Sequence, residues 1–503
     1  MSPLTRRTLI AGGIASAGVT VLAPVAANAL SYPFTLGVAS GEPAADGFVI
    51  WTRLAPSPLD ADGLGGMGTA SVSVEWQVST DQRFTQVVRS GTATAAQTWA
   101  HSVHVEVTGL LPGREYYYRF RAAGHISPVG RGVTAPAVGT SPSLTMLFAS
   151  CAHYEEGYFT AYRRMAEENP DLVLHLGDYI YEGGATTTKV RKFLPGTEIA
   201  SLADYRVRHA QYKTDVDLQA AHAVAPWLVV WDDHEVENNY AALVRANTSP
   251  AGDFKARRAA AYKAYYEHMP LRAAQAPVAE NMQLYRRVRW GSLATFHMLD
   301  TRQYRDDQAC DDGTKVCAEA DDPSRTLTGA TQEAWLLDGM RQKLATWDLL
   351  GQQVFFAQKL ASADGAKSMD SWDGYSANRD RLQRGWDAAG LRNTVVLTGD
   401  VHRSWAANLM MNYTTQDRII GTELVTTSVT SSGDGNAADN GLSSLNPHVK
   451  FYKNLRGYVR TVTSPTRMDV DFRFVDRVST RDYPVRTLQS YVVEAGNPGL
   501  QAP

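Results

Sequence analysis

The sequence predicts a mixed α/β (α+β) fold in two parts: an all-β N-terminal part, then a larger part in which helices flank two packed sheets. Three observations predict this fold. Short runs of alternating apolar and polar residues fill 32–138, which is typical of half-buried strands. From residue 143, apolar runs of strand length alternate with helical stretches. The 503 residues also exceed what a single hydrophobic core usually holds.

Residues 1–29 indicate an export signal rather than part of the fold. Arg6-Arg7 precedes a Gly- and Ala-rich apolar stretch, and small residues suited to cleavage end at Ala29. This pattern is typical of a twin-arginine signal peptide. A membrane anchor is the weaker alternative, because the run is short and Pro24 interrupts it. We therefore expect the twin-arginine translocation machinery as a partner, a secreted or extracytoplasmic location, and no transmembrane anchor.

Residues 30–138 are expected to form a β-sandwich. The segments 72–78 and 101–107 alternate cleanly, and Leu110-Leu-Pro-Gly makes a turn before an aromatic strand. The Leu-Pro-Gly…Tyr pattern resembles a fibronectin type III module, which implies a scaffold rather than a catalytic unit. Small residues and prolines in 134–142 indicate a linker.

Residues 143–480 are expected to form the larger domain. Helices are predicted at 158–168, 201–223, 254–268, 331–344 and 379–389. Strands are predicted at 144–150, 172–176, 227–231, 285–288, 293–299, 353–357, 394–397, 422–429 and 468–474. The tail 481–503 is polar, and we expect a short helix in it near 487–492.

The overall charge excludes one class of partner. The formal net charge is −3, so the chain lacks the basic footprint of a protein that binds nucleic acid or an anionic membrane. We therefore expect no nucleic-acid-specific site.

Three cysteines leave several alternatives open. Cys310 and Cys317 flank a polar loop, and in an exported protein they either close a small disulfide or remain two free thiols. Cys151 follows an apolar strand, where a thiol is a metal ligand, a nucleophile or an inert buried group.

Acidic and basic side chains follow three apolar strands of the larger domain. The strands at 172–176, 227–231 and 394–397 each run into an aspartate with a histidine or tyrosine nearby. Strand ends are where α/β sheets build their sites, and converging carboxylates repel one another unless a cation joins them. For a single motif, a helix cap or turn is the simpler interpretation; three motifs together favour a metal site. The residues concerned are Cys151, His153, Asp178, Tyr181, Asp232, Asp233, His234, Asn238, Asn239, Asp400 and His402.

These motifs resemble those of the PhoD-like alkaline phosphatase family. The resemblance implies a metallophosphoesterase β-sandwich flanked by helices, preceded by the fibronectin-III-like domain, and it covers nearly the whole chain. It rests on Phe148-Ala-Ser-Cys151, Gly177-Asp-Tyr-Ile-Tyr-Glu182, Trp231-Asp-Asp-His-Glu-Val-Glu-Asn-Asn239, Asp300-Thr-Arg-Gln-Tyr-Arg305 and Gly399-Asp-Val-His-Arg-Ser-Trp405.

The resemblance also implies a mixed iron–calcium centre. Metallophosphoesterases outside this family carry other motifs where this chain has Ser150-Cys151-Ala-His153 and Gly399-Asp-Val-His402. The family's ligands, carried onto this chain, assign Fe³⁺ to Cys151, Asp178, Tyr181 and His402. Asp178 would bridge to Ca²⁺, which Asp233 and Asp400 would hold together with Asn238 or Asn239. Thiolate and phenolate ligands would give the protein a purple or brown colour.

Roles for the remaining residues follow from the chemistry of phosphate esters. A metal-bound hydroxide would attack phosphorus in line with the leaving alkoxide. His234 is expected to protonate the leaving group or to contact phosphate. Arg302 and Arg305 either clamp phosphate or form solvated salt bridges. His153 lies either behind the metal ligands or at the surface.

Three functions compete. The first is an exported alkaline phosphomonoesterase with phosphodiesterase activity, acting on a phosphate-ester substrate. The second is a calcium-stimulated phospholipase D-like phosphodiesterase that acts on lipid head groups, which a strong apolar rim would favour. The third is a binding protein with a degenerate hydrolase domain, and the intact acids and bases argue against it.

Overall fold

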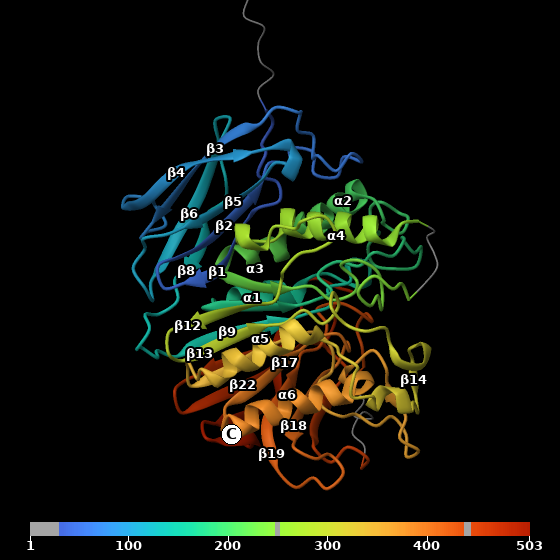
Figure 1. Ribbon diagram of the computed structural model, residues 1–503. Coiled ribbons are helices and arrows are strands. Elements are labelled where there is room, and N and C mark those ends of the chain that lie inside the picture. Colours follow the sequence, from blue (N-terminus) through green and yellow to red (C-terminus); the bar gives the residue numbers. More distant parts are fainter. Residues whose placement is uncertain (1–29, 247–251, 437–443) are drawn as a thin grey trace, which may run out of the picture.

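Two large sheets dominate the computed structural model, which describes residues 30–246, 252–436 and 444–503 (Figure 1). The predicted signal peptide lies outside these residues. The first sheet has ten strands in the spatial order β24 (Asn497–Gln501), β23 (Val485–Glu494), β22 (Arg467–Val475), β21 (Arg456–Thr463), β9 (Leu144–Ala149), β10 (Leu172–Leu176), β11 (Pro226–Val230), β1 (Val38–Ala44), β2 (Gly47–Arg53) and β5 (Ser102–Val107). The second has seven, in the order β12 (Arg286–Trp290), β13 (Ala294–Met298), β15 (Trp347–Gly351), β17 (Thr394–Thr398), β19 (Ile419–Val425), β18 (Ser404–Met410) and β20 (Val449–Lys453).

Parallel strands lie at the centre of both sheets. In the first, β9, β10 and β11 pair in parallel, and in the second β13, β15, β17 and β19 do the same. Every residue of β10, β11, β15 and β17 is buried. Strands covered on both faces read as continuous apolar runs, which explains the sequence pattern at these positions.

Helices cover the outer faces of the two sheets (Figure 1). Met165, Leu218 and Tyr262, from three of the first four helices, share a buried cluster with the strands of the first sheet. Leu336 and Trp386, from the last two helices, pack with Val396 of β17. The helices are α1 (Thr160–Glu167), α2 (Leu202–Lys213), α3 (Val216–Val224), α4 (Phe254–His268), α5 (Gly329–Arg341) and α6 (Ser376–Ala388).

Apart from one short 3-10 helix, the regular elements of the described N-terminal part are strands, but this part is not a separate sandwich. One of its layers is a five-stranded sheet, and Val74 and Tyr118 of that sheet pack against Phe48 and Val103. The other layer consists of β1, β2 and β5, which extend the ten-stranded sheet because β1 pairs in parallel with β11. The expected boundary near residue 138 therefore does not divide the sheets. The five strands are β3 (Val72–Ser79), β4 (Val87–Ala95), β6 (Glu115–Ala122), β7 (His125–Ile126) and β8 (Gly130–Val133).

Three predicted elements need correction. The strand expected at 353–357 lies earlier, as β15, because the amides of Phe356 and Ala357 donate to the Glu423 carboxylate instead of to a neighbouring strand. The helix expected near 487–492 is part of strand β23, which pairs with β22 and continues into β24. The helix expected at 201–223 divides into α2 and α3, because Asp215 caps the second helix.

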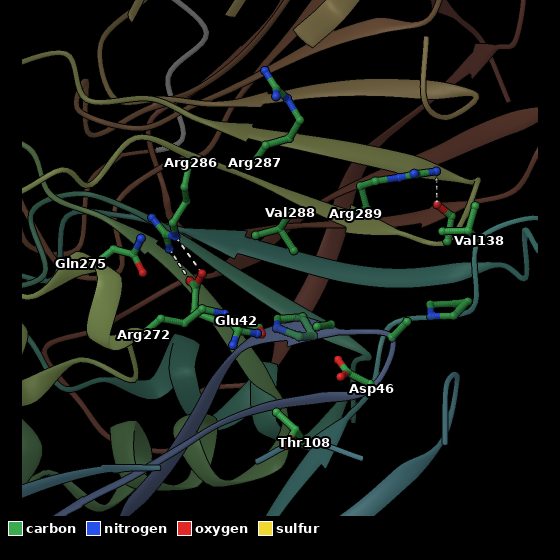
Figure 2. Close-up of a pocket in the computed structure, with 15 residues that line it drawn as sticks. Glu42, Asp46, Thr108, Val138, Arg272, Gln275, Arg286, Arg287, Val288 and Arg289 are labelled. Atoms are coloured by element: carbon green, nitrogen blue, oxygen red, sulfur yellow. Dashed lines mark hydrogen bonds and ion pairs between the residues drawn. The ribbon is translucent and has the colours of Figure 1, made fainter. Parts of the chain in front are cut away.

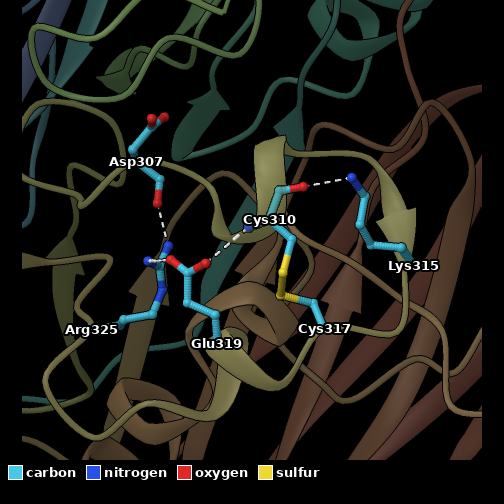
Figure 3. Close-up of a disulfide and its surroundings, with 6 residues drawn as sticks. All are labelled: Asp307, Cys310, Lys315, Cys317, Glu319 and Arg325. Carbon is cyan, nitrogen blue, oxygen red and sulfur yellow. Dashed lines mark hydrogen bonds and ion pairs between the residues drawn. A yellow bond between two sulfur atoms is a disulfide. The ribbon is translucent and has the colours of Figure 1, made fainter.

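Cys310 and Cys317 form a disulfide, so the free-thiol alternative for this pair is wrong (Figure 3). The loop that they close contains β14 (Thr314–Lys315), which pairs with β16 (Lys367–Ser368). The described residues also form short 3-10 helices, of which η4 and η5 lie at the two ends of this loop: η1 (Gln97–Trp99), η2 (Tyr154–Glu156), η3 (Ala273–Gln275), η4 (Ala309–Asp311), η5 (Ala318–Asp321) and η6 (Trp372–Tyr375). Within the described ranges, no helix has the length and apolar character needed to cross a membrane.

Candidate metal centre and active site

The ends of strands from both sheets meet at one edge. Ser150, directly after β9, forms a bridge with Ser428, which follows β19 of the other sheet. Glycines permit this close approach. A Cβ atom on Gly177 (φ +102°) would lie 2.5 Å from Cβ of Asp232, and one on Gly399 would lie 2.8 Å from the Ser150 side chain. The Gly-Asp motifs thus bring the strand ends together.

A first group of metal-ligating side chains forms at this edge. Donor atoms of Cys151, Asp178 and His402 all lie within 4.8 Å of one another. The Tyr181 hydroxyl donates to Asp178 Oδ2 at 2.9 Å and lies 3.1 Å from His402 Nε2. All four residues expected to hold iron are therefore neighbours. Cys151, Asp178 and His402 each adopt a left-handed backbone conformation, with φ between +54° and +60°.

A second group shares Asp178 with the first. Donor atoms of Asp178, Asp233 and His234 also lie within 4.8 Å of one another. Asp178 Oδ1 and Asp233 Oδ1 are buried and have no hydrogen-bond partner among the described residues. Asp233 Oδ1 lies 3.7 Å from an Arg302 nitrogen, which is an ion pair but not a hydrogen bond. Buried carboxylate oxygens normally accept hydrogen bonds, so these two atoms fit a cation shared through Asp178.

The electrostatics of the site also fit a cation. Burial raises the pKa of Asp178 well above its ordinary value, and the charges of Asp233 and Asp232 add to this effect. Burial, together with Asp178, raises the pKa of the Cys151 thiol. Burial lowers the pKa of His402 to about 3. Without a cation, several anionic side chains held so close together destabilise the fold. A bound cation would instead lower the pKa values of the carboxylates and of the thiol.

Asp400 and Asn238 lie at the margin of these groups. Asp400 follows β17, and burial together with the charges of Asp232 and Asp370 raises the pKa of its carboxyl. It belongs to neither group of closely spaced donors found among the described residues. The backbone N–H of Asn238 donates to Glu182 Oε1 at 2.7 Å, and the residue is half-buried.

His234 is held in a fixed orientation. Its Nδ1 lies 2.7 Å from Glu182 Oε2, and its ring lies 4.2 Å from that of Tyr181. Burial disfavours the imidazolium, but Glu182, Asp233 and Asp178 outweigh burial and raise the pKa of His234 well above its ordinary value. With Nδ1 engaged, the other ring nitrogen is left for a substrate or a water molecule.

Arg302 does not point into open space. It is fully buried, its Nε donates to Asp232, and its two terminal nitrogens donate to Asp370 at 2.7 and 2.8 Å. Arg305 donates to the same carboxylate of Asp370 and to the Thr301 carbonyl. Neither expected arrangement, a phosphate clamp or a solvated salt bridge, describes this buried network. Arg302 instead holds the loop after β11 in place.

His153 lies behind the first group rather than at an open surface. Its ring is 4.5 Å from that of Tyr181 and 5.0 Å from that of Phe193. Burial lowers the pKa of its imidazole to about 4, so the ring packs as a neutral group.

Sequence reasoning missed two carboxylates that shape the site. Glu235 accepts hydrogen bonds from the backbone amides of Asp178, Tyr179 and Asp232, and so ties the loops after β10 and β11 together. Asp370 joins Arg302, Arg305 and Gln308. Glu235 lies inside a quoted motif, whereas no local signal marks Asp370.

Two cations beside Asp400 were also missed. Lys359 Nζ lies 5.6 Å from the centre of the Phe355 ring and 5.4 Å from that of Trp405. Burial lowers the pKa of Lys359, and Arg403 contributes while Asp373 and Asp400 oppose the shift. Arg403 directly follows His402, is exposed, and has no ion pair with another described residue. An exposed guanidinium next to the first group of donor atoms is suited to bind an anion.

A separate cavity lies away from this edge. It has a volume of about 540 Å³ and lies between the turn after β1 and strand β12 (Figure 2). Glu42 and Arg286 form an ion pair there, and Arg272 and Gln275 line the wall. None of the residues named above as metal-ligating contributes to it.

Known proteins match this arrangement over almost the whole chain. Residues 146–472 match the family described as PhoD-like phosphatase, and residues 20–136 match its N-terminal domain. Alkaline phosphatase D of Bacillus subtilis (strain 168) is 48% identical over 513 residues, which cover 98% of this chain and 87% of that protein.

Solved structures support the same relationship. A structure of PhoD superposes with a TM-score of 0.90 at 48% identity, covering 94% of this chain and 92% of that one. A purple acid phosphatase from yellow lupin (Lupinus luteus) seeds superposes with a TM-score of 0.55 at 12% identity, covering 92% and 74%, which shows a shared fold alone. The N-terminal and larger parts, with the donor groups at the sheet edge, identify the chain as a member of the PhoD-like phosphatase family.

Proposed function

We propose that the protein is a metal-dependent hydrolase of phosphate esters, an alkaline phosphomonoesterase with phosphodiesterase activity. The observation that carries this proposal is the pair of donor groups that share Asp178 at the meeting edge of two sheets. Two cations a few Å apart are the usual means of binding a phosphoryl group and its nucleophile. The 48% identity to an alkaline phosphatase D supports the same reaction class.

The donor chemistry supports two unlike cations. The thiol of Cys151, the phenol of Tyr181 and the imidazole of His402 suit Fe³⁺, with Asp178 as the shared ligand. The oxygens of Asp233, Asp400 and Asn238 suit Ca²⁺. When bound, such cations activate water and neutralise charge on the phosphoryl oxygens.

His234 supplies the proton for the leaving group. Glu182 fixes Nδ1 and favours the protonated ring, so the imidazolium is available as a general acid at the free nitrogen. Tyr181 packs against the His234 ring, and a ring nitrogen of His234 lies within 4.8 Å of a carboxylate oxygen of Asp178. A fixed acid beside the donor groups suits an alkoxide that leaves as its bond to phosphorus breaks.

Arg403 replaces Arg302 as our choice for the cation that contacts substrate. Asp232 and Asp370 occupy all three guanidinium nitrogens of Arg302, whereas Arg403 is exposed next to His402. Lys359, over Phe355 and Trp405, extends the same positively charged rim. We therefore assign Arg302 to positioning and Arg403 to phosphate.

We also propose that the twin-arginine translocation machinery exports the folded protein. Arg6-Arg7 and the small residues before cleavage support this pathway, and a folded cargo suits a protein that acquires its metals before export. Fusion of residues 1–40 to a reporter that folds in the cytoplasm, with and without Arg6-Arg7→Lys-Lys, tests it. We expect export of the first fusion and retention of the second; export of both would contradict the assignment.

A substrate comparison tests the proposed reaction. Metal-loaded protein is assayed with p-nitrophenyl phosphate, bis-p-nitrophenyl phosphate and phosphatidylcholine, with and without Ca²⁺. We expect turnover of the two aryl esters at alkaline pH and little turnover of the lipid. Preference for phosphatidylcholine would favour the phospholipase D-like alternative, and no turnover of any of the three would refute an enzyme.

A further inference from the structure

The geometry points to a positioning role for Asp312: carried by the loop that Cys310 and Cys317 close, it orients Asn239 and thereby Asp233 for calcium. This inference rests on the proposed function, because it concerns the calcium side of the same site. It assigns a role to the disulfide loop, which the motifs of the site do not include. The loop lies more than seventy residues beyond Asn239 in the sequence.

Asn239 is the link between the loop and the site. Its backbone N–H donates to Asp233 Oδ2 at 2.7 Å, and its side-chain amide donates to Asp312 Oδ2 at 2.6 Å. Its carbonyl accepts a hydrogen bond from Gln308 Nε2 at 2.8 Å. The residue is held on three sides in a left-handed conformation, with φ +53°. Asn239 thus engages Asp233 Oδ2. The other oxygen, Oδ1, accepts no hydrogen bond from a described residue and lies 3.7 Å from an Arg302 nitrogen, so it remains available to a cation.

The loop that carries Asp312 has a costly backbone. Cys310, Asp311, Asp312 and Gly313 have φ values of +51°, +60°, +59° and +84° in succession. A left-handed conformation is unfavourable for each non-glycine residue, so surrounding contacts must impose this shape. Those contacts are the disulfide, a hydrogen bond from Cys310 N to Glu319, and another from Lys315 Nζ to the Cys310 carbonyl (Figure 3).

The same loop reaches the site by a second route. β14, within the loop, pairs with β16, and Asp370 lies two residues beyond β16. Gln308 Nε2 donates to both Asp370 Oδ1 and the Asn239 carbonyl, each at 2.8 Å. Through Asp370 and Arg302, the loop is also connected to Asp232. One covalently closed segment therefore supports both aspartates that follow β11.

The expected effect of breaking this link is on metal affinity. Partners that orient a metal ligand contribute about 10- to 100-fold to affinity. Asp312→Ala leaves the Asn239 amide without its acceptor and should weaken Ca²⁺ binding about 10-fold. Asp312→Asn retains an acceptor oxygen and should bind Ca²⁺ as the unaltered protein does. Cys310→Ser with Cys317→Ser releases the loop and should resemble Asp312→Ala.

Calorimetric titration of chelator-treated protein with Ca²⁺ alone tests the inference. Asp311→Ala is the matched control, since Asp311 is exposed in the same loop and makes no side-chain hydrogen bond to a described residue. Thermal unfolding and the Ca²⁺ dependence of p-nitrophenyl phosphate hydrolysis are measured on the same samples. We expect weaker Ca²⁺ binding and a higher Ca²⁺ requirement in Asp312→Ala, rescue in Asp312→Asn, and no change in Asp311→Ala.

Each other outcome overturns the inference. Equal Ca²⁺ affinity in Asp312→Ala and the unaltered protein would remove Asp312 from the site while leaving the proposed function intact. If Asp311→Ala weakens Ca²⁺ binding as much as Asp312→Ala does, the loss of a negative charge in the loop would explain both results, and the contact with Asn239 would not. Unaltered protein that neither binds Ca²⁺ nor hydrolyses the ester would refute the proposed function, and this inference with it.

Discussion

Tyr181 donates a hydrogen bond to Asp178 Oδ2 at 2.9 Å, across the two residues that separate them in the chain. The same phenolic oxygen accepts from Ser431 Oγ at 2.7 Å and lies 3.1 Å from His402 Nε2. One hydroxyl therefore connects loops that follow β10, β17 and β19. This arrangement places a phenol, a carboxylate and an imidazole around one point, which is the basis of the predictions that follow.

Arg302→Gln should destabilise the protein more than it affects substrate binding. The substitution leaves the buried carboxylates of Asp232 and Asp370 without their partner, at a cost of about 3–5 kcal/mol. Denaturant unfolding measures this change. A stable variant whose KM alone rises would restore Arg302 as a phosphate clamp.

Arg403→Ala should show the opposite pattern. Loss of a charge-assisted hydrogen bond to phosphate costs about 1.5–3 kcal/mol, which corresponds to a rise in KM of roughly tenfold or more. Because Arg403 is exposed and has no ion pair with a described residue, we expect an unchanged melting temperature. Steady-state kinetics with p-nitrophenyl phosphate check this, with Arg384→Ala on the exposed surface as a control. An unchanged KM would exclude Arg403 from the substrate site.

His234→Asn should affect poor leaving groups most. General acid catalysis contributes about 10²- to 10⁴-fold, and a nitrophenolate needs little protonation. We expect kcat for an alkyl phosphate to fall within that range and kcat for p-nitrophenyl phosphate to fall far less. Glu182→Gln, which removes the carboxylate at Nδ1, should reproduce part of the effect. Equal losses for the two substrates would contradict proton donation by His234.

The buried amine of Lys213 should make the free energy of unfolding depend on pH. Its amine is buried 3.3 Å from His222 Nε2, and burial lowers its pKa from 10.5 to about 7. Between pH 7 and about 10 the unfolded chain binds more protons than the folded one, so this group makes stability rise with pH. Below pH 7 the Lys213 amine is charged in the folded protein as well, and the full free-energy cost of burying that charge is present. The stability contributed by this residue is therefore greatest at alkaline pH.

Lys213→Met removes the buried amine and should abolish that part of the pH dependence. We expect the increase in melting temperature to be largest at and below pH 7 and to disappear near pH 10. Lys343→Met, at an exposed position, is the control. A pH profile of Lys213→Met parallel to that of the unaltered protein would show that Lys213 is not the group responsible.

The assignment of the candidate ligands to iron and calcium rests on the family resemblance and stays a prediction. Their place at the sheet edge could be predicted from sequence, because each follows a buried strand and belongs to a local motif. Cys151, Asp178 and His402 satisfy both conditions, and the structure brings their donor atoms together. The role of Arg302 could not be predicted, because its partner Asp370 lies 68 residues away in a loop without a motif. Spacing alone also gave no reason to separate a phosphate clamp from a buried ion pair.

For the fold, likewise, local sequence patterns predicted individual strands but not the pairing of strands that lie far apart in the chain. Apolar runs identified the central parallel strands β10, β11 and β17, whose two faces are both buried, whereas the strand next to β17, β15, was predicted too late in the chain. The pairing of β1 with β11 depends on contacts between residues such as Ser40 and Pro226, which no local pattern encodes. The tail strand β23 carries polar residues because it lies near the edge of the sheet, which is why its sequence suggested a helix instead.

The visible absorption spectrum and iron content of Tyr181→Phe test the central claim most directly. Tyr179→Phe is the matched control, since the Tyr179 hydroxyl lies 2.9 Å from His222 rather than among the metal-ligating residues. We predict that the unaltered protein and Tyr179→Phe contain iron and share a charge-transfer band, and that Tyr181→Phe loses or shifts the band. Unaltered protein without iron, or an identical spectrum in Tyr181→Phe, would contradict the assignment of Tyr181 as an iron ligand.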